Sequence, residues 1–322
     1  MMTKEDRPAA RYAMINLWDR MGMLLIFAIA FSCCSIFIPN FLTWVNMKGL
    51  ALSVSMVGMV ACTMLFCLAS GHFDLSIESV VAFSGVLAAV VTNETGNIAA
   101  GIAAGIAAGG VVGLVNGVVI SKFHINALIT TLATMQIVRG LAYIVSGGKA
   151  VGVVRDAFFV LGTSEFIGLP TPVWITIACF IVFGILLRTT TFGRNTLAIG
   201  GKEDAARLSG LPVDRIKIAI FLLQGLMAGF AGVVLASRLT SGQPGTSQGF
   251  ALEVIAACVL GGVSLTGGVG TMVGTVVGVL IMGTVQNAMN LLSISPFYQY
   301  IARGTILLIA VLLDQLKQHY RR

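Results

Sequence analysis

The sequence predicts an all-α membrane protein with about ten transmembrane helices. Hydrophobic residues make up 57% of the 322 residues, and charged residues make up only 10%. The mean hydropathy is +0.95. Several uncharged runs approach the roughly 20 residues that cross the hydrocarbon core of a bilayer. A soluble protein could not cover its surface with so few polar side chains.

Five uncharged apolar runs each predict one transmembrane helix. They cover residues 21–39, 50–70, 98–121, 169–187 and 218–237. Five further segments contain a charged residue or several glycines but are otherwise apolar. These cover residues 74–92, 125–146, 250–262, 267–291 and 296–313. Together the segments give about ten crossings.

The distribution of lysine and arginine predicts the orientation in the membrane. If the helices alternate and the N-terminus lies inside, most of the 20 basic residues fall in cytoplasmic segments. The outer loops then keep only Lys48, Lys149, Arg155 and Arg238. The positive-inside rule therefore predicts that both termini are cytoplasmic. This arrangement accounts for the net charge of +7 without a nucleic acid partner.

The predicted organisation is one membrane domain with short polar ends. Residues 1–20 form a cytoplasmic N-terminal segment, residues 21–314 form the transmembrane domain, and residues 315–322 form a cytoplasmic tail. Within the domain, residues 188–217 form a charged stretch between two apolar runs. The same charge rule places this stretch in the cytoplasm.

A weak internal repeat divides the chain into two halves. Residues 71–85 (GHFDLSIESVVAFSG) are similar to residues 249–262 (GFALEVIAACVLGG), and each copy precedes a glycine-periodic helix and a helix with an Arg-Gly pair. An odd number of helices separates the copies, so one copy is inverted. The alternative is chance similarity between apolar helices. Glycines at every fourth position predict a close-packing ridge in each half, at Gly101, Gly105, Gly109, Gly113 and Gly117, and at Gly270, Gly274 and Gly278.

The first helix of each repeat is short or interrupted by charge. Broken helices at corresponding positions of two halves indicate a transport pathway, because non-helical backbone at membrane depth needs protein or water beside it. The sequence therefore predicts gates at the two breaks, with a polar lining and phenylalanines that close it. The candidate residues are Phe73, Asp74, Ser76, Glu78, Phe250, Glu253, Gln286, Asn287 and Asn290.

Four charged residues lie inside predicted helices: Glu78, Arg139, Glu253 and Arg303. A charge at the centre of a membrane helix costs about 2.5–3.5 kcal/mol on insertion scales, so each of the four is a functional candidate. The alternative is a structural role. The glutamates would then pair with arginines or cap broken helices, and the arginines would need carboxylate or carbonyl partners.

The sequence contains no catalytic or metal-binding pattern. The three histidines are far apart, and the six cysteines lie in apolar runs without metal-ligand spacing. The segment Gly147-Gly148-Lys149-Ala150 lacks the first glycine and the Ser/Thr of a phosphate-binding loop. We therefore expect a chain that is not an enzyme and holds neither a metal nor a cofactor.

The charged stretch contains a candidate docking element for another protein. Residues 203–209 are expected to form a short helix, with Glu203 and Asp204 at its positive end and Arg207 near its negative end. Gly200 and Gly201 before it and Gly210 after it would bound it as an autonomous element. Small residues at its centre suit a groove on a partner, although an ordinary surface loop is the alternative. The candidate coupling residues are Gly201, Lys202, Glu203, Asp204, Ala205, Ala206, Arg207, Leu208, Ser209 and Gly210.

Three segments resemble signatures of the ATP-binding-cassette monosaccharide permeases, the group for ribose, xylose, galactose and arabinose. They are residues 193–210 (GRNTLAIGGKEDAARLSG), residues 72–85 (HFDLSIESVVAFSG) and residues 259–278 (VLGGVSLTGGVGTMVGTVVG). The resemblance covers about residues 22–314 and is closest to members that import L-arabinose. Two positions depart from the family pattern, since Glu78 stands in place of a glycine and Lys202 in place of an asparagine.

The resemblance implies a homodimer of ten-helix subunits in the bacterial inner membrane, with inverted repeats similar to the larger vitamin-importer type. It also implies a cytoplasmic ATPase that docks on residues 203–209 and carries ATP and Mg²⁺ itself. A periplasmic binding protein would deliver the sugar, with L-arabinose as the expected substrate. Lipid and a second copy of the chain complete the expected partners.

An ion-coupled secondary transporter of a small polar solute is the alternative function. Such a protein would use Glu78 or Glu253 to couple uptake to a proton or sodium gradient. The two functions differ in whether uptake follows that gradient or intracellular ATP.

Overall fold

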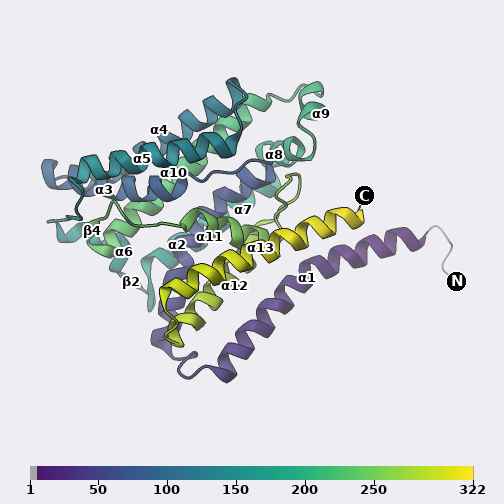
Figure 1. Cartoon of the computed structure of the whole chain (residues 1–322), viewed down its shortest axis with the longest axis horizontal. Helices are drawn as coiled ribbons and strands as arrows, with labels where there is room; N and C mark the ends of the chain where they lie inside the picture. Colours follow the sequence, from purple (N-terminus) through teal and green to yellow (C-terminus); the bar gives the residue numbers. More distant parts are fainter. Residues whose placement is uncertain (1–5, 322) are drawn as a thin grey trace.

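A computed structural model describes residues 6–321, and it describes the side chains of residues 22–312 and 315. Residues 1–5 of the predicted N-terminal segment and residue 322 of the predicted tail lie outside the described residues. The elements in chain order are α1 (Asp6–Phe37), α2 (Trp44–Ala69), α3 (Ile77–Thr95), α4 (Ile98–Lys122), α5 (Ala127–Ser146), β1 (Val151–Gly152), η1 (Asp156–Phe159), α6 (Val160–Thr163), β2 (Glu165–Phe166), β3 (Leu169–Pro170), α7 (Thr171–Thr189), α8 (Thr191–Gly201), α9 (Glu203–Leu208), α10 (Val213–Leu239), β4 (Ser241–Gly242), α11 (Phe250–Leu260), α12 (Met272–Leu291) and α13 (Pro296–Arg321). Figure 1 shows an almost entirely helical molecule.

Seven of the described helices are long and apolar enough to span a bilayer: α2, α3, α4, α5, α7, α10 and α12. Three shorter apolar stretches lie in α1, α11 and α13. These ten segments coincide with the predicted apolar runs, and the all-α membrane fold is confirmed. Several boundaries differ: α2 and α10 begin earlier than predicted, at Trp44 and Val213, and α12 begins later, at Met272. Helix α3 begins at Ile77 and leaves Asp74 in the preceding loop.

Helix α2 forms the centre of the protein core. Side chains from all around its second half are buried, among them Met59, Met64, Leu65 and Phe66. A helix that is apolar on every side is surrounded either by other helices or by lipid. Here α7, α10, α11 and α12 pack against α2.

The predicted glycine ridge of α4 packs against two neighbouring helices. A Cβ atom on Gly109 would meet the carbonyl oxygen of Gly225 in α10, and a Cβ atom on Gly113 would meet that of Phe221. Toward the start of α4, Gly105 lies against the carbonyl of Ser84 in α3. Only hydrogen fits at these positions, so the predicted close packing of the first ridge is confirmed.

The second ridge is shorter than predicted. Gly274 and Gly278 of α12 lie against the backbone carbonyls of Gly261 and Ala257, at the end of α11. Gly270 does not belong to this ridge, because it precedes α12 and lies beside the side chains of Leu65 and Val263. Gly270 keeps the spacing of four residues, but it lies in the loop before α12. Glycine spacing alone does not show where the helix begins.

The connections between helices gather at two ends of the molecule. Strand β1 pairs with β4 and β2 pairs with β3, both antiparallel. Figure 1 places β2 and the short helix α9 at opposite ends, with α9 on the same side as the start of α1 and the end of α13. The described part of the N-terminal segment is helical and continuous with α1.

Candidate functional site

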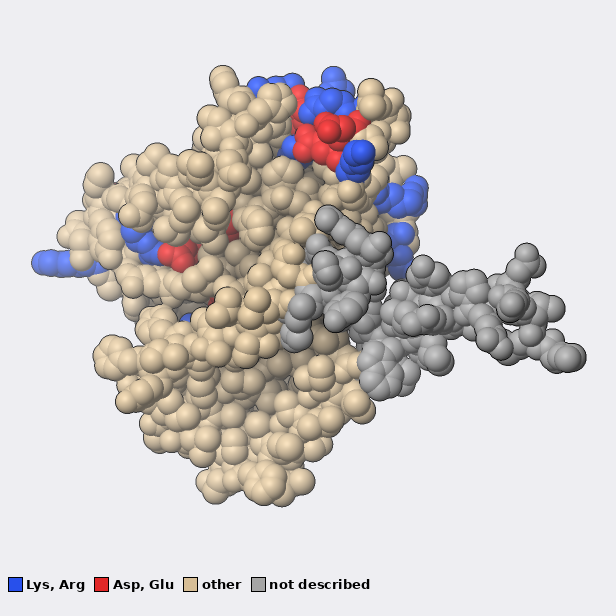
Figure 2. All heavy atoms as spheres, turned by 45° about the vertical axis from the view of Figure 1, so that its right-hand side comes forward, with Lys and Arg blue, Asp and Glu red and all other residues tan. Residues whose placement is uncertain are grey.

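Charged side chains gather on the surface around helix α9, as the red and blue cluster in Figure 2 shows. Helix α9 has six residues, begins after the extended Lys202, and ends before Gly210, whose φ is +82°. Glycine occupies this left-handed conformation without strain, which explains why the helix stops there. The short helix was predicted, and it ends one residue earlier than expected because Ser209 is its C-cap.

Ion pairs connect α9 to α10 and α4. Lys217 of α10 donates to Glu203 with an Nζ–Oε2 distance of 2.6 Å, and its side chain is only 5% exposed. Arg207 lies 3.0 Å from Asp214, which is also 3.3 Å from Lys122. A buried lysine needs an anionic partner, so Glu203 links the short helix firmly to a membrane helix.

The pKa of Glu203 reflects this contact. Partial burial raises the pKa of Glu203, but the hydrogen bond and the positive charge of Lys217 outweigh it, so the pKa lies below its ordinary value of 4.5. The carboxylate is therefore ionised at neutral pH. The position of Lys217 in the pair was missed by the sequence reading, since a lysine at the edge of an apolar run usually faces solvent.

The two central alanines of α9 differ in exposure, whereas the sequence analysis expected both to suit a groove on a partner. Ala205 is exposed, but Ala206 is buried against the hydrophobic core of this chain. The apolar side chain that α9 presents to solvent is Leu208, which is 90% exposed. A partner would therefore meet Ala205 and Leu208, and Ala206 serves the fold.

The two glycines before α9 lie at the end of α8, and Lys202 separates the two helices. Both glycines belong to α8, which continues to Gly201. A Cβ atom on Gly200 would meet the carbonyl oxygen of Ala69 and the amide nitrogen of Gly268. Gly200 therefore serves close packing, whereas a Cβ atom on Gly201 would meet no other atom.

The break between α2 and α3 contains a buried chain of hydrogen bonds. Asp74 accepts from the backbone N–H and the hydroxyl of Ser76, at 2.9 and 2.6 Å. Asn116 of α4 donates to the Ser76 hydroxyl at 3.0 Å, and Thr134 of α5 donates to Asn116 at 2.7 Å. Asp74, Ser76 and Asn116 are buried. The chain fixes the break against α4 and α5.

Glu78 connects the two predicted gates. Its carboxylate accepts from the backbone N–H of Gly249 at 2.9 Å and lies 3.7 Å from Arg139 of α5. Arg139 also donates to the carbonyl oxygens of Pro244 and Thr246, both at 2.8 Å. The start of α3 is thus held to the loop that precedes α11.

The second half contains a similar pair. Glu253 in the first turn of α11 lies 3.2 Å from Arg303 of α13, and the guanidinium of Arg303 lies over the ring of Tyr300 at 5.1 Å from its centroid. In both halves, a glutamate near the start of a helix meets an arginine two long helices later. The predicted carboxylate and carbonyl partners of the two arginines are confirmed.

The remaining predicted pathway residues have other contacts. Phe73 and Phe250 are half-buried and pack against the main core. Asn287 exchanges hydrogen bonds with Asn46 at 2.8 and 2.9 Å, and Asn290 accepts from Gln299 at 2.9 Å. Gln286 is half-buried on the same helix, α12. None of these hydrogen bonds joins the three residues to Glu78 or Glu253.

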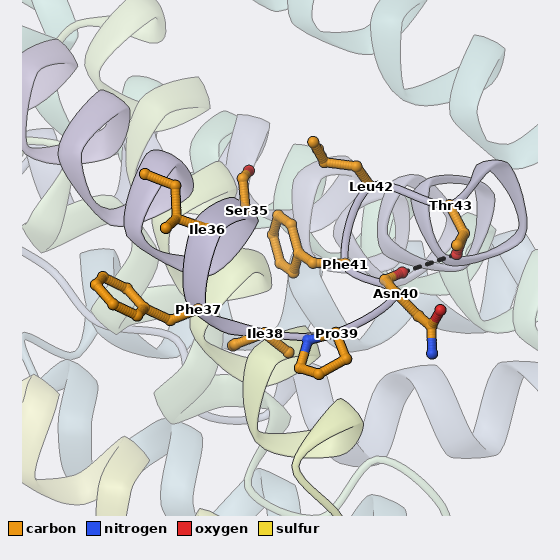
Figure 3. A pocket seen from close by; sticks show the side chains of 9 residues that line it. All are labelled: Ser35, Ile36, Phe37, Ile38, Pro39, Asn40, Phe41, Leu42 and Thr43. Atoms are coloured by element: carbon orange, nitrogen blue, oxygen red, sulfur yellow. Dashed lines mark hydrogen bonds between the residues drawn. The ribbon is translucent and has the colours of Figure 1, made fainter.

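A shallow hollow of about 500 Å³ lies at the turn between α1 and α2 (Figure 3). Its lining consists of nine consecutive residues, 35–43, and Thr43 donates to the carbonyl of Asn40 at 2.8 Å. The hollow contains no predicted pathway residue. We therefore do not assign it to the gates.

Comparison with known proteins identifies the family. Residues 46–311 match the family model described as the permease component of branched-chain amino acid transport systems. The chain belongs to this permease family. It is 62% identical to the L-arabinose transport system permease protein AraH of Escherichia coli K12, over 98% of this chain and 96% of AraH.

Other relatives of this permease carry related descriptions. The L-arabinose ABC transporter permease protein AraH of Azospirillum brasilense is 55% identical over 97% of this chain and 92% of its own length. The ribose import permease protein RbsC of Bacillus subtilis is 40% identical over 98% of each chain. No solved structure matches the permease.

Proposed function

We propose that this permease is the membrane subunit of an ATP-driven importer of L-arabinose. The observation that carries the proposal is the 62% identity to an L-arabinose permease along nearly the whole chain. The identity to a ribose permease is lower, at 40% over a similar length. The protein acts as a transport subunit, and ATP and Mg²⁺ bind to a separate ATPase.

The ATPase is proposed to dock on α9 and the residues beside it, 201–210. Exposed Ala205 and Leu208 provide an apolar contact, and the surrounding charges provide specificity. Because α9 is tied to α10 by a buried ion pair and follows α8 directly, a push on α9 would move these helices as a unit. This rigidity supports a coupling role.

The pathway is proposed to pass where the two broken segments meet. Glu78 and Arg139 join the start of α3 to the loop before α11, and Glu253 and Arg303 lie close to the start of α11. Carboxylate and guanidinium groups can hydrogen-bond sugar hydroxyls. Their ion pairs favour a closed passage that binds solute only weakly, so specificity would belong to the periplasmic binding protein.

The matching Glu–Arg pairs and the matching glycine contacts of α4 on α3 and of α12 on α11 support an inverted repeat of the vitamin-importer type. We propose ten crossings in the bacterial inner membrane. Both termini would be cytoplasmic, because the start of α1 and the end of α13 lie on the same side of the molecule as α9. Residues 21–314 would form the membrane domain, with 188–217 as its coupling loop.

A second copy of the chain is proposed to complete the importer. Helix α5 exposes Ile137, Gly140 and Ile144 along one face, and α13 exposes Ile301 and Gly304. A Cβ atom on either of these glycines would meet no other atom, so a backbone can approach there. The rest of the apolar surface would contact lipid.

Purification with a candidate partner tests the assignment. The permease is co-expressed with an ATPase from an arabinose import system and isolated through a tag on the permease. We expect a stable complex that contains ATPase and permease, while the permease alone shows no saturable arabinose binding at micromolar sugar. Micromolar binding by the permease alone, without any ATPase association, would favour a secondary transporter.

A further inference from the structure

The β2–β3 hairpin exposes an apolar side chain at a turn that β-branched residues rarely occupy. Ile167 has a φ of 50° and Gly168 a φ of 75°, so both are left-handed, and they connect the paired strands β2 and β3. Asn or Gly usually fills the first of these positions, because a β-branched side chain is strained there. Ile167 is nevertheless 74% exposed. Packing inside the chain does not explain an isoleucine at this site.

Aromatic side chains surround the hairpin. Phe166 is 62% exposed and contacts Trp174 edge to face, with ring centroids 5.9 Å apart. Trp174 Nε1 donates to the carbonyl oxygen of Phe166 at 2.9 Å. A Cβ atom on Gly168 would lie 3.6 Å from the ring of exposed Trp44. Two of the three tryptophans of the chain therefore lie at this hairpin.

The charges beside the hairpin neutralise each other. Lys48 of α2 lies 2.8 Å from Glu165 of β2, and their side chains are 27% and 49% exposed. A soluble partner is usually attracted by a surface of one charge sign. This paired arrangement provides no such attraction, and it leaves an apolar, aromatic surface with a polar edge.

The hairpin lies about one membrane thickness from α9. Trp44 is the first residue of α2, and the last residue, Ala69, touches Gly200 near the end of α8. The 26 residues of α2 span about 39 Å, compared with a hydrocarbon core of about 30 Å. Figure 1 likewise places β2 and α9 at opposite ends of the molecule. With α9 at the cytoplasmic surface, as proposed above, this length brings the hairpin to the level of the opposite lipid headgroups.

We propose that Trp44, Phe166, Ile167 and Trp174, the hairpin patch, bind the interfacial layer of the lipid bilayer. Tryptophan is enriched at this layer because its ring is apolar and its N–H is polar. Phe166 and Ile167 insert among the upper acyl chains, and the Lys48–Glu165 pair stays at the headgroups. The patch thereby anchors the first residues of α2 and α7 at the membrane surface. This role does not depend on which solute is transported.

Fluorescence quenching tests the depth of the patch. Trp174 is made the only tryptophan by Trp18→Phe and Trp44→Phe, and the full chain is placed in nanodiscs of brominated phosphatidylcholine. We expect bromine near the glycerol end of the acyl chains to quench Trp174 about twofold more than bromine near the methyl end. Aqueous iodide should quench weakly. Strong iodide quenching without bromine quenching, or stronger quenching by the deep bromine, would overturn the proposal.

Ile167→Asn tests the role of the hairpin tip, since Asn tolerates the left-handed conformation and removes the apolar side chain. The thermal midpoint in detergent should stay unchanged, while bromine quenching of Trp174 decreases. Val154→Asn is the matched control, because Val154 is another exposed β-branched residue of the same connection. Unchanged quenching in Ile167→Asn, or a lowered midpoint in detergent, would contradict the anchoring role.

Discussion

Glu78 in the first turn of α3 accepts a hydrogen bond of 2.9 Å from the backbone N–H of Gly249, 171 residues later in the chain. Gly249 is the N-cap of α11 and has a φ of +76°. One carboxylate therefore joins the starts of α3 and α11, the two helices that the sequence predicts to be short or interrupted. A movement that separated the start of α3 from Gly249 would break this bond.

Glu78→Gln is expected to impair transport without preventing assembly. Glutamine keeps an oxygen for the Gly249 N–H but removes the negative charge beside Arg139. Because Arg139 keeps two carbonyl acceptors, we expect a loss of only about 1–3 kcal/mol in stability. Uptake by the assembled importer should fall about tenfold.

Glu253→Gln should behave similarly, since Glu253 pairs with Arg303. Glu165→Gln is the control, because Glu165 forms an exposed ion pair whose loss costs at most about 1 kcal/mol. Radiolabelled sugar uptake and size-exclusion chromatography measure the two effects. Full uptake in both gate variants would remove these carboxylates from the pathway.

Leu208→Asp should weaken ATPase binding while the permease folds normally. Leu208 is 90% exposed, and burial of a leucine side chain in a docking groove contributes about 1.5–3 kcal/mol. We therefore expect at least a roughly tenfold lower affinity for the ATPase, with Ala205→Asp acting in the same direction. Pull-down of the ATPase and thermal melting of the permease distinguish binding from folding.

Ala206→Asp is compared with Leu208→Asp, because Ala206 is buried in the core of the permease itself. Its unpaired carboxylate should lower the yield and the melting temperature of the permease itself. If Ala206→Asp folded as well as Leu208→Asp, the proposed division between docking and core residues on α9 would be wrong.

The Glu203–Lys217 pair should show strong coupling between two mutations. Glu203→Gln leaves the buried Lys217 charge without an anionic partner and should destabilise the permease. Glu203→Gln combined with Lys217→Met should recover stability, because Met fills a similar volume without charge. Thermal melting of the two single variants and the double variant measures the coupling energy. Simple additivity would contradict a buried, interacting pair.

The same pair predicts an effect of pH. The folded-state pKa of Glu203 lies below its ordinary value of 4.5. Its contribution to stability is therefore present above that value and is lost as the pH falls through the folded-state pKa. Melting curves from neutral to acidic pH should show a smaller acid destabilisation in the Glu203→Gln and Lys217→Met double variant than in the wild type.

Gly109→Leu with Gly113→Leu should greatly reduce the amount of folded permease. Their hydrogens face the carbonyls of α10, where no side chain fits. Gly49→Leu is the control, since a Cβ atom at Gly49 would meet no other atom. Quantitative immunoblots and melting temperatures compare the variants. Equal abundance of the double variant and Gly49→Leu would contradict close helix packing at the ridge.

The sequence predicted those features that depend on local pattern and on the cost of burying charge. Apolar length located the membrane segments, and the period of four glycines predicted the ridge of α4. The high cost of a charge in a bilayer predicted partners for Arg139 and Arg303, and the structure shows Glu78 and Glu253 in these positions.

Features that depend on contacts between distant segments could not be predicted. The carbonyls of Pro244 and Thr246 reach Arg139 only because the loop folds back over α5. Gly200 belongs to α8 and packs closely against Ala69, a contact between distant segments that the sequence does not show. Ala206 faces the core for the same reason, since a helix of six residues has too little pattern to show its buried side.

Uptake by proteoliposomes tests the proposed function most directly. The permease is reconstituted with an arabinose-system ATPase, L-arabinose is supplied with its binding protein, and the energy source is varied. We predict sugar accumulation that requires enclosed ATP and the binding protein and that disappears with Leu208→Asp. Accumulation driven by a proton or sodium gradient in vesicles without the ATPase would contradict the account and establish a secondary transporter.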